Sequence, residues 1–485
     1  MVAMPPAALS TPVRRALAAA GGGVLGAFSL PPWGWWPLGI AGLALYAFAL
    51  DGASRRSRAW SGAAFGLGMF SIGLWWITEF HAVGYVALLA LEISFFVAAA
   101  MTTTRLVVFP AAVVLAEAAR GAVPFGGLPL GGLALGQAES PLVASSRIGG
   151  ALLVLALAAA IGSGVVALAR TSTHRAGAAL IAVAVVVAAV GWIAPAGSPT
   201  SDDPIDAVVV QGGGRRGFRA VESDPGDVLD AHVRASDDID GPVDLVVWPE
   251  NAIDVDAIDD SDAGQLLAAI AQETGATVVA GVTQDAGIDG FENTAVVWTP
   301  DGEITDRYTK VRRVPFGEYV PMRALIERLA DLSVLPRDAV AGRGPGIVLT
   351  PAGPLAVAIS YEVFFSDRAR SGVRAGGEVL LVPTNAASFT TSQVPTQEVA
   401  AAQLRAWETG RWVLQAAPTG YSAVIDERGR VRHRSVLGEA QLLSDEVPRR
   451  DGQTIYMRLG DVPLLVVAAA ALLLGVGRMR GFRGD

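Results

Sequence analysis

Residues 307–321 read Arg307-Tyr-Thr-Lys310-Val-Arg-Arg-Val-Pro-Phe-Gly-Glu318-Tyr-Val-Pro321, and the rest of the chain is interpreted outward from this stretch. Lys310 is the only lysine among the 485 residues, because every other Lys/Arg position is arginine. A lysine ammonium is a compact point charge, whereas the arginine guanidinium is planar and permanently protonated. The single lysine therefore indicates a chemical role for Lys310. The alternative is a composition bias that removed lysines and left one by chance.

The composition is too apolar for an ordinary soluble enzyme, with 52% hydrophobic residues and a mean hydropathy of +0.44. The formal net charge is -9, so the chain lacks the basic footprint of a nucleic-acid-binding protein. It has no cysteine, which excludes disulfides, thiolate metal sites and a cysteine nucleophile. The four histidines are scattered without ligand spacing, and we expect neither a metal site nor a cofactor.

Eight apolar runs have the length that crosses a bilayer, which is about 17–25 residues. They lie at about 13–30, 35–50, 59–78, 82–100, 104–119, 147–169, 177–194 and 459–477. Arginines gather in alternate connections, at 14–15, 55–58, 105, 170–175 and 478–483, whereas the opposite loops 31–37 and 79–84 have none. Arg120 and Arg147 in the third opposite loop are exceptions. This bias predicts that both termini lie in the cytoplasm and that the polar block 196–458 lies outside it. The first run fits an uncleaved helix better than a signal peptide.

The expected organisation is a polytopic α-helical membrane domain with eight spans and an extracytoplasmic α/β domain. Seven membrane helices lie in 1–194, a linker in 195–204, the α/β domain in 205–458, the eighth helix in 459–478 and a cytoplasmic tail in 479–485. Short β-branched runs predict strands at 206–211, 243–248, 276–282, 294–298, 355–360, 378–383 and 412–416, and helical periodicity is clearest at 263–273 and 395–409. Within the membrane domain we interpret Glu92 as a packing or cavity residue, because an ionisable group there is costly. The long 121–149 loop is either a surface arm or an irregular connection.

Polar residues follow three of the predicted strands. Glu250 follows the run beginning at Val243, Ser360 and Glu362 follow the run beginning at Leu355, and Lys310 follows the strand pair around 292–308. In open α/β sheets ligands bind beyond the carboxyl ends of the strands, so these ends can converge on one site.

These residues and their neighbours resemble the nitrilase, or carbon–nitrogen hydrolase, superfamily, whose sites use a Glu, a Lys and a Cys. Trp-Pro-Glu250-Asn is similar to the general-base motif, Lys310 to Pro321 is similar to the lysine segment with its second glutamate, and Ile359-Ser360-Tyr361-Glu362 is similar to the Cys-Tyr-Glu nucleophile motif. The membrane spans narrow the resemblance to the apolipoprotein N-acyltransferase family. Further similar stretches are Phe28-Ser-Leu-Pro-Pro-Trp-Gly-Trp-Trp-Pro37, Phe65-Gly-Leu-Gly-Met-Phe70, Glu117-Ala-Ala-Arg-Gly121 and Arg405-Ala-Trp-Glu-Thr-Gly-Arg411. The resemblance implies a nitrilase-like α-β-β-α sandwich.

The chain departs from the family pattern at two places. Ser360 stands where the family has its nucleophilic Cys, and Asn385-Ala-Ala-Ser-Phe389 stands where the family usually has Asn-Asp followed by Trp-Phe. Three interpretations of Ser360 stay open: a slow or adapted nucleophile, an engineered replacement that traps the enzyme, or a natural relative without transfer activity. A hydroxyl beside a base forms acyl-enzymes elsewhere, but it ionises less readily than a thiol.

The resemblance implies a two-step acyl transfer in a bacterial inner membrane, the last step of lipoprotein maturation. The nucleophile takes an acyl chain from a phospholipid, and the diacylglyceryl-cysteine amine of an apolipoprotein then takes it from the enzyme. Glu250 acts as general base for the nucleophile and later for the amine, and Lys310 stabilises each oxyanion. Glu318, Glu362 and Tyr361 are supporting residues, with the two glutamates orienting Lys310 and the acyl group. We expect a monomer without a nucleic-acid partner.

Two other functions remain open at this stage. One is a non-catalytic scaffold for a membrane partner, such as a polyprenol-phosphate mannose synthase. The other is a membrane-anchored amidase, for which eight spans would be excessive.

Overall fold

The computed structural model describes residues 11–217, 224–288, 290–328, 332 and 335–480. It divides the chain into two compact units. The first consists of Met1–Ile193 and Leu459–Asp485, and the second of Ala194–Arg458.

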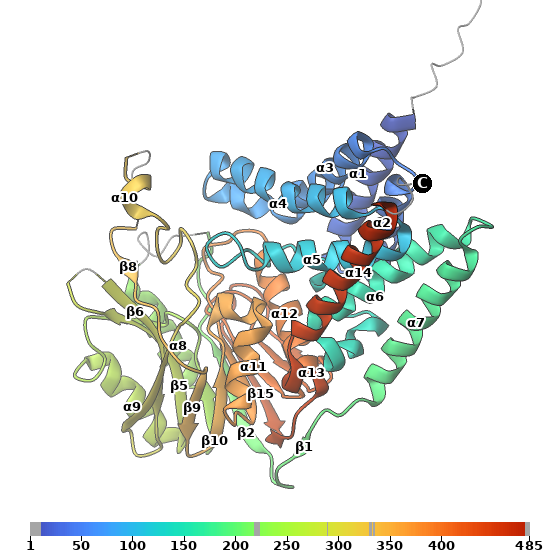
Figure 1. Cartoon of the computed structure of the whole chain (residues 1–485). Helices are drawn as coiled ribbons and strands as arrows, with labels where there is room; N and C mark the ends of the chain where they lie inside the picture. The colour runs from blue at the N-terminus through green and yellow to red at the C-terminus, as the bar shows by residue number, and fades with distance from the viewer. Residues whose placement is uncertain (1–10, 218–223, 289, 329–331, 333–334, 481–485) are drawn as a thin grey trace, which may run out of the picture. The chain divides into compact units, whose positions relative to one another are not determined.

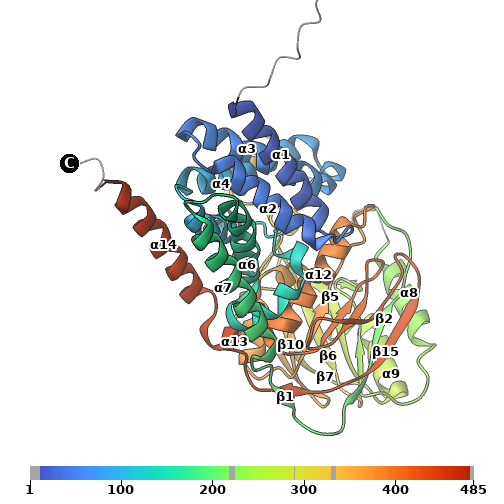
Figure 2. The same cartoon turned by 90° about the vertical axis from the view of Figure 1, so that its right-hand side faces the viewer.

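The first unit is helical, and a helix overlaps each of the eight predicted spans. The helices are α1 (Thr11–Ser29), α2 (Trp36–Leu50), α3 (Arg55–Gly73), α4 (Ala82–Thr102), α5 (Phe109–Arg120), α6 (Ser146–Leu168), α7 (His174–Ile193) and α14 (Val462–Arg480). Figure 2 shows α1 beside α2 and α3, with which it packs.

Three helical segments of the described chain are long and apolar enough to cross a membrane: Ala82–Thr102, Pro141–Leu168 and His174–Ile193. Trp36–Leu50 and Val462–Gly475 are apolar but shorter. The predicted span 104–119 overlaps α5, whose 12 residues cover only roughly 18 Å. The number of eight spans therefore stays a prediction.

A buried arginine organises the interior of the first unit. Arg120 Nε donates to Glu92 at 2.6 Å, Arg120 Nη1 donates to Glu117 at 2.8 Å, and Arg120 Nη2 donates to the carbonyl of Leu130 at 2.6 Å. Glu92 is thus a packing residue held by an ion pair, because an unpaired carboxylate would be costly in this interior. The Leu130 contact anchors the 121–149 loop.

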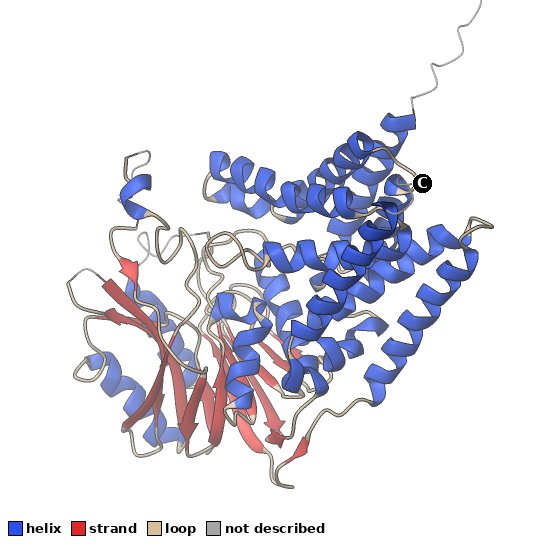
Figure 3. Cartoon of the chain, in the orientation of Figure 1, coloured by secondary structure: helices blue, strands red, loops and turns tan. Residues whose placement is uncertain are grey.

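The second unit contains two large sheets, drawn in red in Figure 3. In the described residues one has eight strands in the order β15-β2-β3-β5-β6-β7, with β4 on β5 and β8 on β6, and the other has six in the order β14-β13-β12-β11-β10-β9. The first comprises β2 (Ile205–Gln211), β3 (Leu245–Val247), β4 (Ile253–Val255), β5 (Thr277–Asp285), β6 (Gly290–Trp298), β7 (Ile304–Thr309), β8 (Asp338–Ala339) and β15 (Gln441–Val447). The second comprises β9 (Ile347–Thr350), β10 (Gly353–Val357), β11 (Val379–Pro383), β12 (Val413–Ala416), β13 (Ala423–Ile425) and β14 (Val431–Arg434).

The apolar strand runs divide their side chains between two cores. Val209 and Val247 join a core with Val357 and Leu381 from the other sheet, whereas their neighbours, including Val246, face a core that includes helix residues. This alternation follows from the two-residue period of a strand. Runs that are apolar at every position are therefore buried on both faces.

Helices cover the outer face of each sheet, as Figure 1 shows. On the eight-stranded sheet they are α8 (Pro225–Ser236) and α9 (Asp262–Thr274), and on the six-stranded sheet α11 (Ser366–Arg374) and α12 (Gln393–Thr409). This is the α-β-β-α order that the resemblance implied. The short helices α10 (Arg323–Ile326) and α13 (Ile455–Leu459) lie outside these layers.

The strands and helices that the sequence predicted in this unit are present, and some further elements have no clear sequence pattern. β14 reads Val-Arg-His-Arg and is exposed throughout, and α11 has a mostly polar sequence. Within the predicted linker, β1 (Ser198–Pro199) pairs with β16 (Arg450–Asp451). The linker and domain limits otherwise remain predictions.

Candidate active site

Glu250 lies beyond the carboxyl end of β3 in a tight turn. Asn251 has a φ of +53°, and the N–H of Gly281 on β5 donates to the carbonyl of Pro249 at 3.1 Å. A Cβ at position 281 would collide with this carbonyl oxygen, so glycine is required for β5 to pass so close to the turn. The turn buries the Glu250 side chain.

Lys310 follows β7 and its side chain is only 2% exposed. Its Nζ lies 2.7 Å from Glu250 Oε1 and 2.7 Å from Glu318 Oε1. Asn293 on β6 donates from Nδ2 to the same two oxygens, at 2.8 Å to Glu250 and 3.0 Å to Glu318. The structure therefore joins Glu250, Lys310 and Glu318 in one buried cluster, completed by Asn293.

Burial and charge set the protonation of this cluster. Burial raises the pKa of Glu250, the Lys310 ammonium lowers it, and Glu318 raises it again, with a net upward shift. Burial lowers the pKa of Lys310, but the two carboxylates raise it more, and the net shift is also upward. Lys310 is therefore a fixed positive charge at neutral pH, and Glu250 is a more basic carboxylate than an exposed one.

Glu318 is held from its second oxygen as well. The N–H of Val314 donates to Glu318 Oε2 at 2.7 Å, so the loop after Lys310 folds back on itself around this carboxylate. Glu318 thereby fixes the position of the ammonium that it contacts.

Ser360 comes from the other sheet. It follows β10, begins a short 3₁₀ helix (Ser360–Phe364) and is buried. Its φ of +49° is unusual for a residue with a side chain, and strained backbone of this kind is concentrated at functional sites. The Ser360 hydroxyl makes no hydrogen bond with any other residue in the described part of the chain.

Glu362 ties the nucleophile segment to the lysine segment. Its Oε1 accepts the N–H groups of Val311 and Arg312, both at 2.9 Å, and its Oε2 accepts the N–H of Ile359 at 3.0 Å. These residues directly follow Lys310 and directly precede Ser360. One fully buried carboxylate thus sets the spacing between the two candidate catalytic residues.

The surroundings of Glu362 include two residues that sequence reasoning missed. The Tyr308 hydroxyl donates to Glu362, and Arg368 Nη2 donates to that hydroxyl at 2.7 Å. Burial raises the pKa of Tyr308, so the phenol stays protonated. Tyr361, which directly follows Ser360, packs edge-on against Phe365 with ring centroids 5.0 Å apart.

The missed residues carry weak sequence signals. Asn293, Tyr308 and Arg368 are polar or amphipathic residues on elements whose partners are remote in the chain. The one usable signal was Asn293, a polar residue directly before the apolar run 294–298. Within the described residues, no group of three or more His, Cys, Asp or Glu side chains is placed to hold a metal ion.

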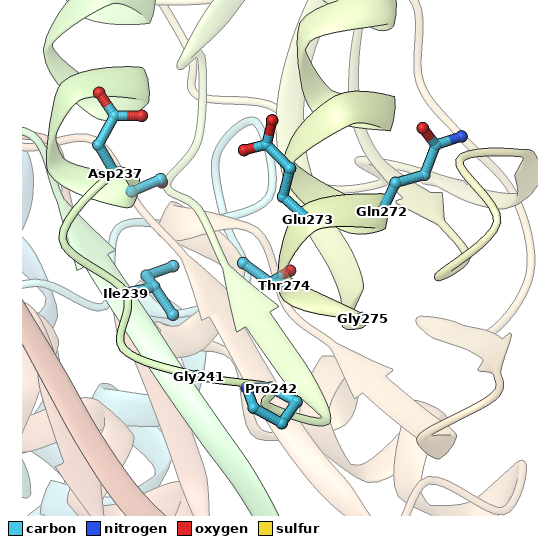
Figure 4. A pocket seen from close by; sticks show the side chains of 9 residues that line it. Asp237, Ile239, Gly241, Pro242, Gln272, Glu273, Thr274 and Gly275 are labelled. Atoms are coloured by element: carbon cyan, nitrogen blue, oxygen red, sulfur yellow. The ribbon is translucent and has the colours of Figure 1, made fainter.

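A separate surface pocket, drawn in Figure 4, lies away from these residues. It is lined by Ser236, Asp237, Ile239, Gly241, Pro242, Gln272, Glu273, Thr274 and Gly275. Pro242 precedes β3 and Gly275 precedes β5, so the pocket lies at the amino ends of strands whose carboxyl ends lead to Glu250. It therefore takes no part in the candidate site.

Comparisons with known proteins cover nearly the whole chain. Residues 22–164 match the apolipoprotein N-acyltransferase N-terminal domain, and residues 208–456 match the carbon-nitrogen hydrolase family. A protein of Mycolicibacterium smegmatis named apolipoprotein N-acyltransferase is 32% identical, over 94% of this chain and 84% of that protein. This chain belongs to the apolipoprotein N-acyltransferase family.

Other apolipoprotein N-acyltransferases are similar over almost their full length. The protein of Azotobacter vinelandii is 31% identical, over 96% of this chain and 95% of its own length, and that of Vibrio vulnificus is 28% identical, over 96% and 98%. Among solved structures, a mutant of the Nesterenkonia AN1 amidase from the nitrilase superfamily is 22% identical with a TM-score of 0.40, over 54% of this chain and 97% of the amidase.

Proposed function

We propose that this member of the family N-acylates apolipoproteins with Ser360 as its nucleophile, Glu250 as general base and Lys310 as oxyanion stabiliser. The chain is an acyltransferase of lipoprotein maturation, with a phospholipid as donor and a lipoprotein as acceptor. The observation that supports the assignment of roles is the buried cluster around Lys310 Nζ, tied through Glu362 to the segment that carries Ser360.

In the first step Ser360 Oγ attacks the ester carbonyl of a phospholipid. Glu250 accepts the hydroxyl proton, and both its contacts to Lys310 and Asn293 use Oε1, which leaves Oε2 for that proton. The ammonium of Lys310 stabilises the tetrahedral oxyanion, and a fixed cation in a site with little water is effective for this. Loss of the lysophospholipid leaves an acyl ester on Ser360.

In the second step the α-amino group of the diacylglyceryl-cysteine attacks this ester. The same ammonium stabilises the second oxyanion, and the serine oxygen leaves to give the N-acylated lipoprotein. Glu318 and Glu362 are positioning residues. Glu318 contacts Lys310 Nζ directly, and Glu362 accepts the backbone N–H groups of the two residues that follow Lys310. Tyr361 contributes apolar surface.

The placement in the membrane is part of the same proposal. The arginine bias of the loops supports eight spans with both termini in the cytoplasm and residues 205–458 outside it. We further propose that the protein is a monomer.

The test is direct detection of the acyl-enzyme. The purified full chain is incubated with phospholipid vesicles and digested after arginine and lysine, which releases residues 344–368 with Ser360. We expect an added fatty acyl mass, localised to Ser360 by fragmentation and absent from Ser360→Ala. No adduct, or an adduct on another residue, would refute the nucleophile.

A second variant distinguishes two interpretations: that Ser360 is an adapted nucleophile, and that the protein is a non-catalytic scaffold. Ser360→Cys introduces a thiol that ionises more readily, and we expect it to raise transfer to a synthetic diacylglyceryl-cysteine peptide. Absence of transfer in both the wild type and this variant would favour a non-catalytic scaffold.

A further inference from the structure

A second carboxyl group lies at the same edge of the six-stranded sheet. Glu398 on α12 is 3% exposed, and one of its oxygens, Oε1, accepts the hydroxyl of Thr384 at 2.6 Å. Its other oxygen, Oε2, is buried and has no hydrogen-bond partner among the residues that the structure describes. A buried polar atom without a partner needs a physical explanation, and a role in proton transfer is one such explanation.

This carboxyl and the proposed nucleophile lie at the carboxyl ends of neighbouring strands. β10 and β11 are parallel neighbours, with Val357 opposite Leu381 in the last pair of the register. Thr384 directly follows β11, and Ser360 follows β10 by three residues. The Ala358 N–H donates to the Leu381 carbonyl at 3.0 Å, so the pairing persists toward the end of the strands. α12 also packs against the 3₁₀ helix that begins at Ser360. Glu398 is thus bonded to the residue that ends the strand next to β10, on a helix that packs against the Ser360 segment.

The charges around Glu398 favour its neutral form. Burial raises its pKa to about 8; the Thr384 hydrogen bond and Lys310 lower it, while Glu250 raises it. On the elements packed against α12, the charged residues are Glu362 on the 3₁₀ helix and Asp367, Arg368, Arg370 and Arg374 on α11. Each of these residues already has a partner. Asp367 forms an ion pair with Arg312, and Glu362 forms one with Arg368. Arg370 and Arg374 donate hydrogen bonds to backbone carbonyl oxygens. At neutral pH Glu398 therefore carries a proton.

Each step of the proposed reaction moves a proton away from one oxygen or nitrogen and onto another oxygen. In the first step Glu250 takes the proton of Ser360, while the departing lysophospholipid alkoxide must gain one. In the second step the attacking amine must lose a proton while the serine oxygen regains one. A single carboxyl can balance each step by passing the proton on, whereas two carboxyl groups allow the base and the acid to act at the same time.

We infer that Glu398 is a second proton-transfer residue, which protonates the leaving alkoxide in the first step and accepts the amine proton in the second. In the first step the ester C–O bond breaks, the bond from acyl carbon to Ser360 Oγ forms, Glu250 becomes neutral and Glu398 becomes a carboxylate. In the second step the amide bond forms, the acyl ester breaks, Glu250 returns its proton to Ser360 and Glu398 regains one. Both carboxyl groups end in their starting states. This inference rests on the proposed role of Ser360.

The test compares Glu398→Gln with the wild type in full-length protein, in phospholipid vesicles with a synthetic diacylglyceryl-cysteine peptide. Gln has the shape of a neutral Glu and still accepts from Thr384, but it cannot transfer a proton. We expect both acyl-Ser360 formation and peptide acylation to fall by about 100-fold or more, the usual range for a general acid or base. Glu378→Gln, which changes a half-buried carboxylate paired with Arg449 at 3.8 Å, is the matched control and should keep normal rates.

The pH profile gives an independent readout in the wild type alone. Because the acid form acts in the first step, single-turnover acylation should decline as pH rises through about 8, and Glu398→Gln should lack this decline. Equal rates in wild type and Glu398→Gln, or a wild-type acylation rate that stays constant from pH 7 to 9, would overturn the role of Glu398 while acyl-Ser360 still forms. Absence of acyl-Ser360 in the wild type would instead overturn the proposed function, and this inference with it.

Discussion

Removal of the ammonium at position 310 tests the central cluster most directly. In Lys310→Met the side chain keeps its length but the charge between Glu250 and Glu318 is lost. The buried Glu250 and the partly buried Glu318 stay within reach of Asn293. Breaking a buried ion pair in this way costs about 3–5 kcal/mol of folding free energy. Loss of one oxyanion-stabilising donor lowers acyl transfer by about 10²- to 10³-fold.

The loss of folding stability in Lys310→Met should depend on pH, and the direction of this dependence follows from the pKa shifts. In the wild type the pKa of Lys310 is raised, so its contribution to stability is complete below its ordinary value and constant between pH 5 and 8. In Lys310→Met the pKa of Glu250 rises further, and the folded variant then binds more protons than its unfolded chain. The stability of the variant therefore falls as pH rises, and its deficit should be larger at pH 8 than at pH 5.

The measurements are thermal unfolding of the full chain in detergent, followed by near-ultraviolet circular dichroism at both pH values, and acylation of Ser360 by mass spectrometry. Arg307→Met is the matched control, because Arg307 pairs with Asp259 at 2.7 Å with both side chains exposed, at 36% and 59%. Such a pair contributes at most about 1 kcal/mol. A Lys310→Met variant no less stable than this control at pH 8, or one that acylates Ser360 at the wild-type rate, would refute the reasoning.

Two further predictions concern the tie between the segments and the placement in the membrane. Glu362→Gln replaces one acceptor oxygen by a donor and leaves at least one of its backbone N–H partners unpaired, so we expect a stability loss of about 1–3 kcal/mol and reduced Ser360 acylation; unchanged unfolding and acylation would show that the tie is dispensable. Because the chain has no cysteine, single Asp259→Cys and Arg56→Cys variants report topology cleanly. A membrane-impermeant maleimide should label the first in intact cells and the second only after permeabilisation, and the reverse pattern would invert the proposed orientation.

Several strands were predictable because of where they lie in the sandwich. β2, β3 and β11 are buried on both faces, and such strands read as short continuous apolar runs. β14 is exposed and β9 is short, so neither has a period that distinguishes it from a loop. α11 was also hard to predict from the sequence. The residues that it buries are Arg368, Ala369, Gly372 and Val373, and this set does not form a clear apolar face.

The candidate site was also predictable only in part. Glu250, Lys310 and Ser360 each follow a strand and belong to a recognisable local motif, so the sequence alone was sufficient to propose them as site residues. Asn293 and Glu398 have no such motif. Each is a polar residue on a regular element, and its importance comes from the groups that surround it after folding.

The amino-acid sequence by itself determined the family, the layered α/β class of the second unit and the residues at the ends of its strands, because these depend on patterns within a few residues. Only the tertiary structure decided which of these residues meet. Lys310 and Glu250 are 60 positions apart, and Glu362 and Val311 are 51 positions apart. Such contacts depend on strand order and register across two sheets, and no local pattern encodes the distance between two strand ends.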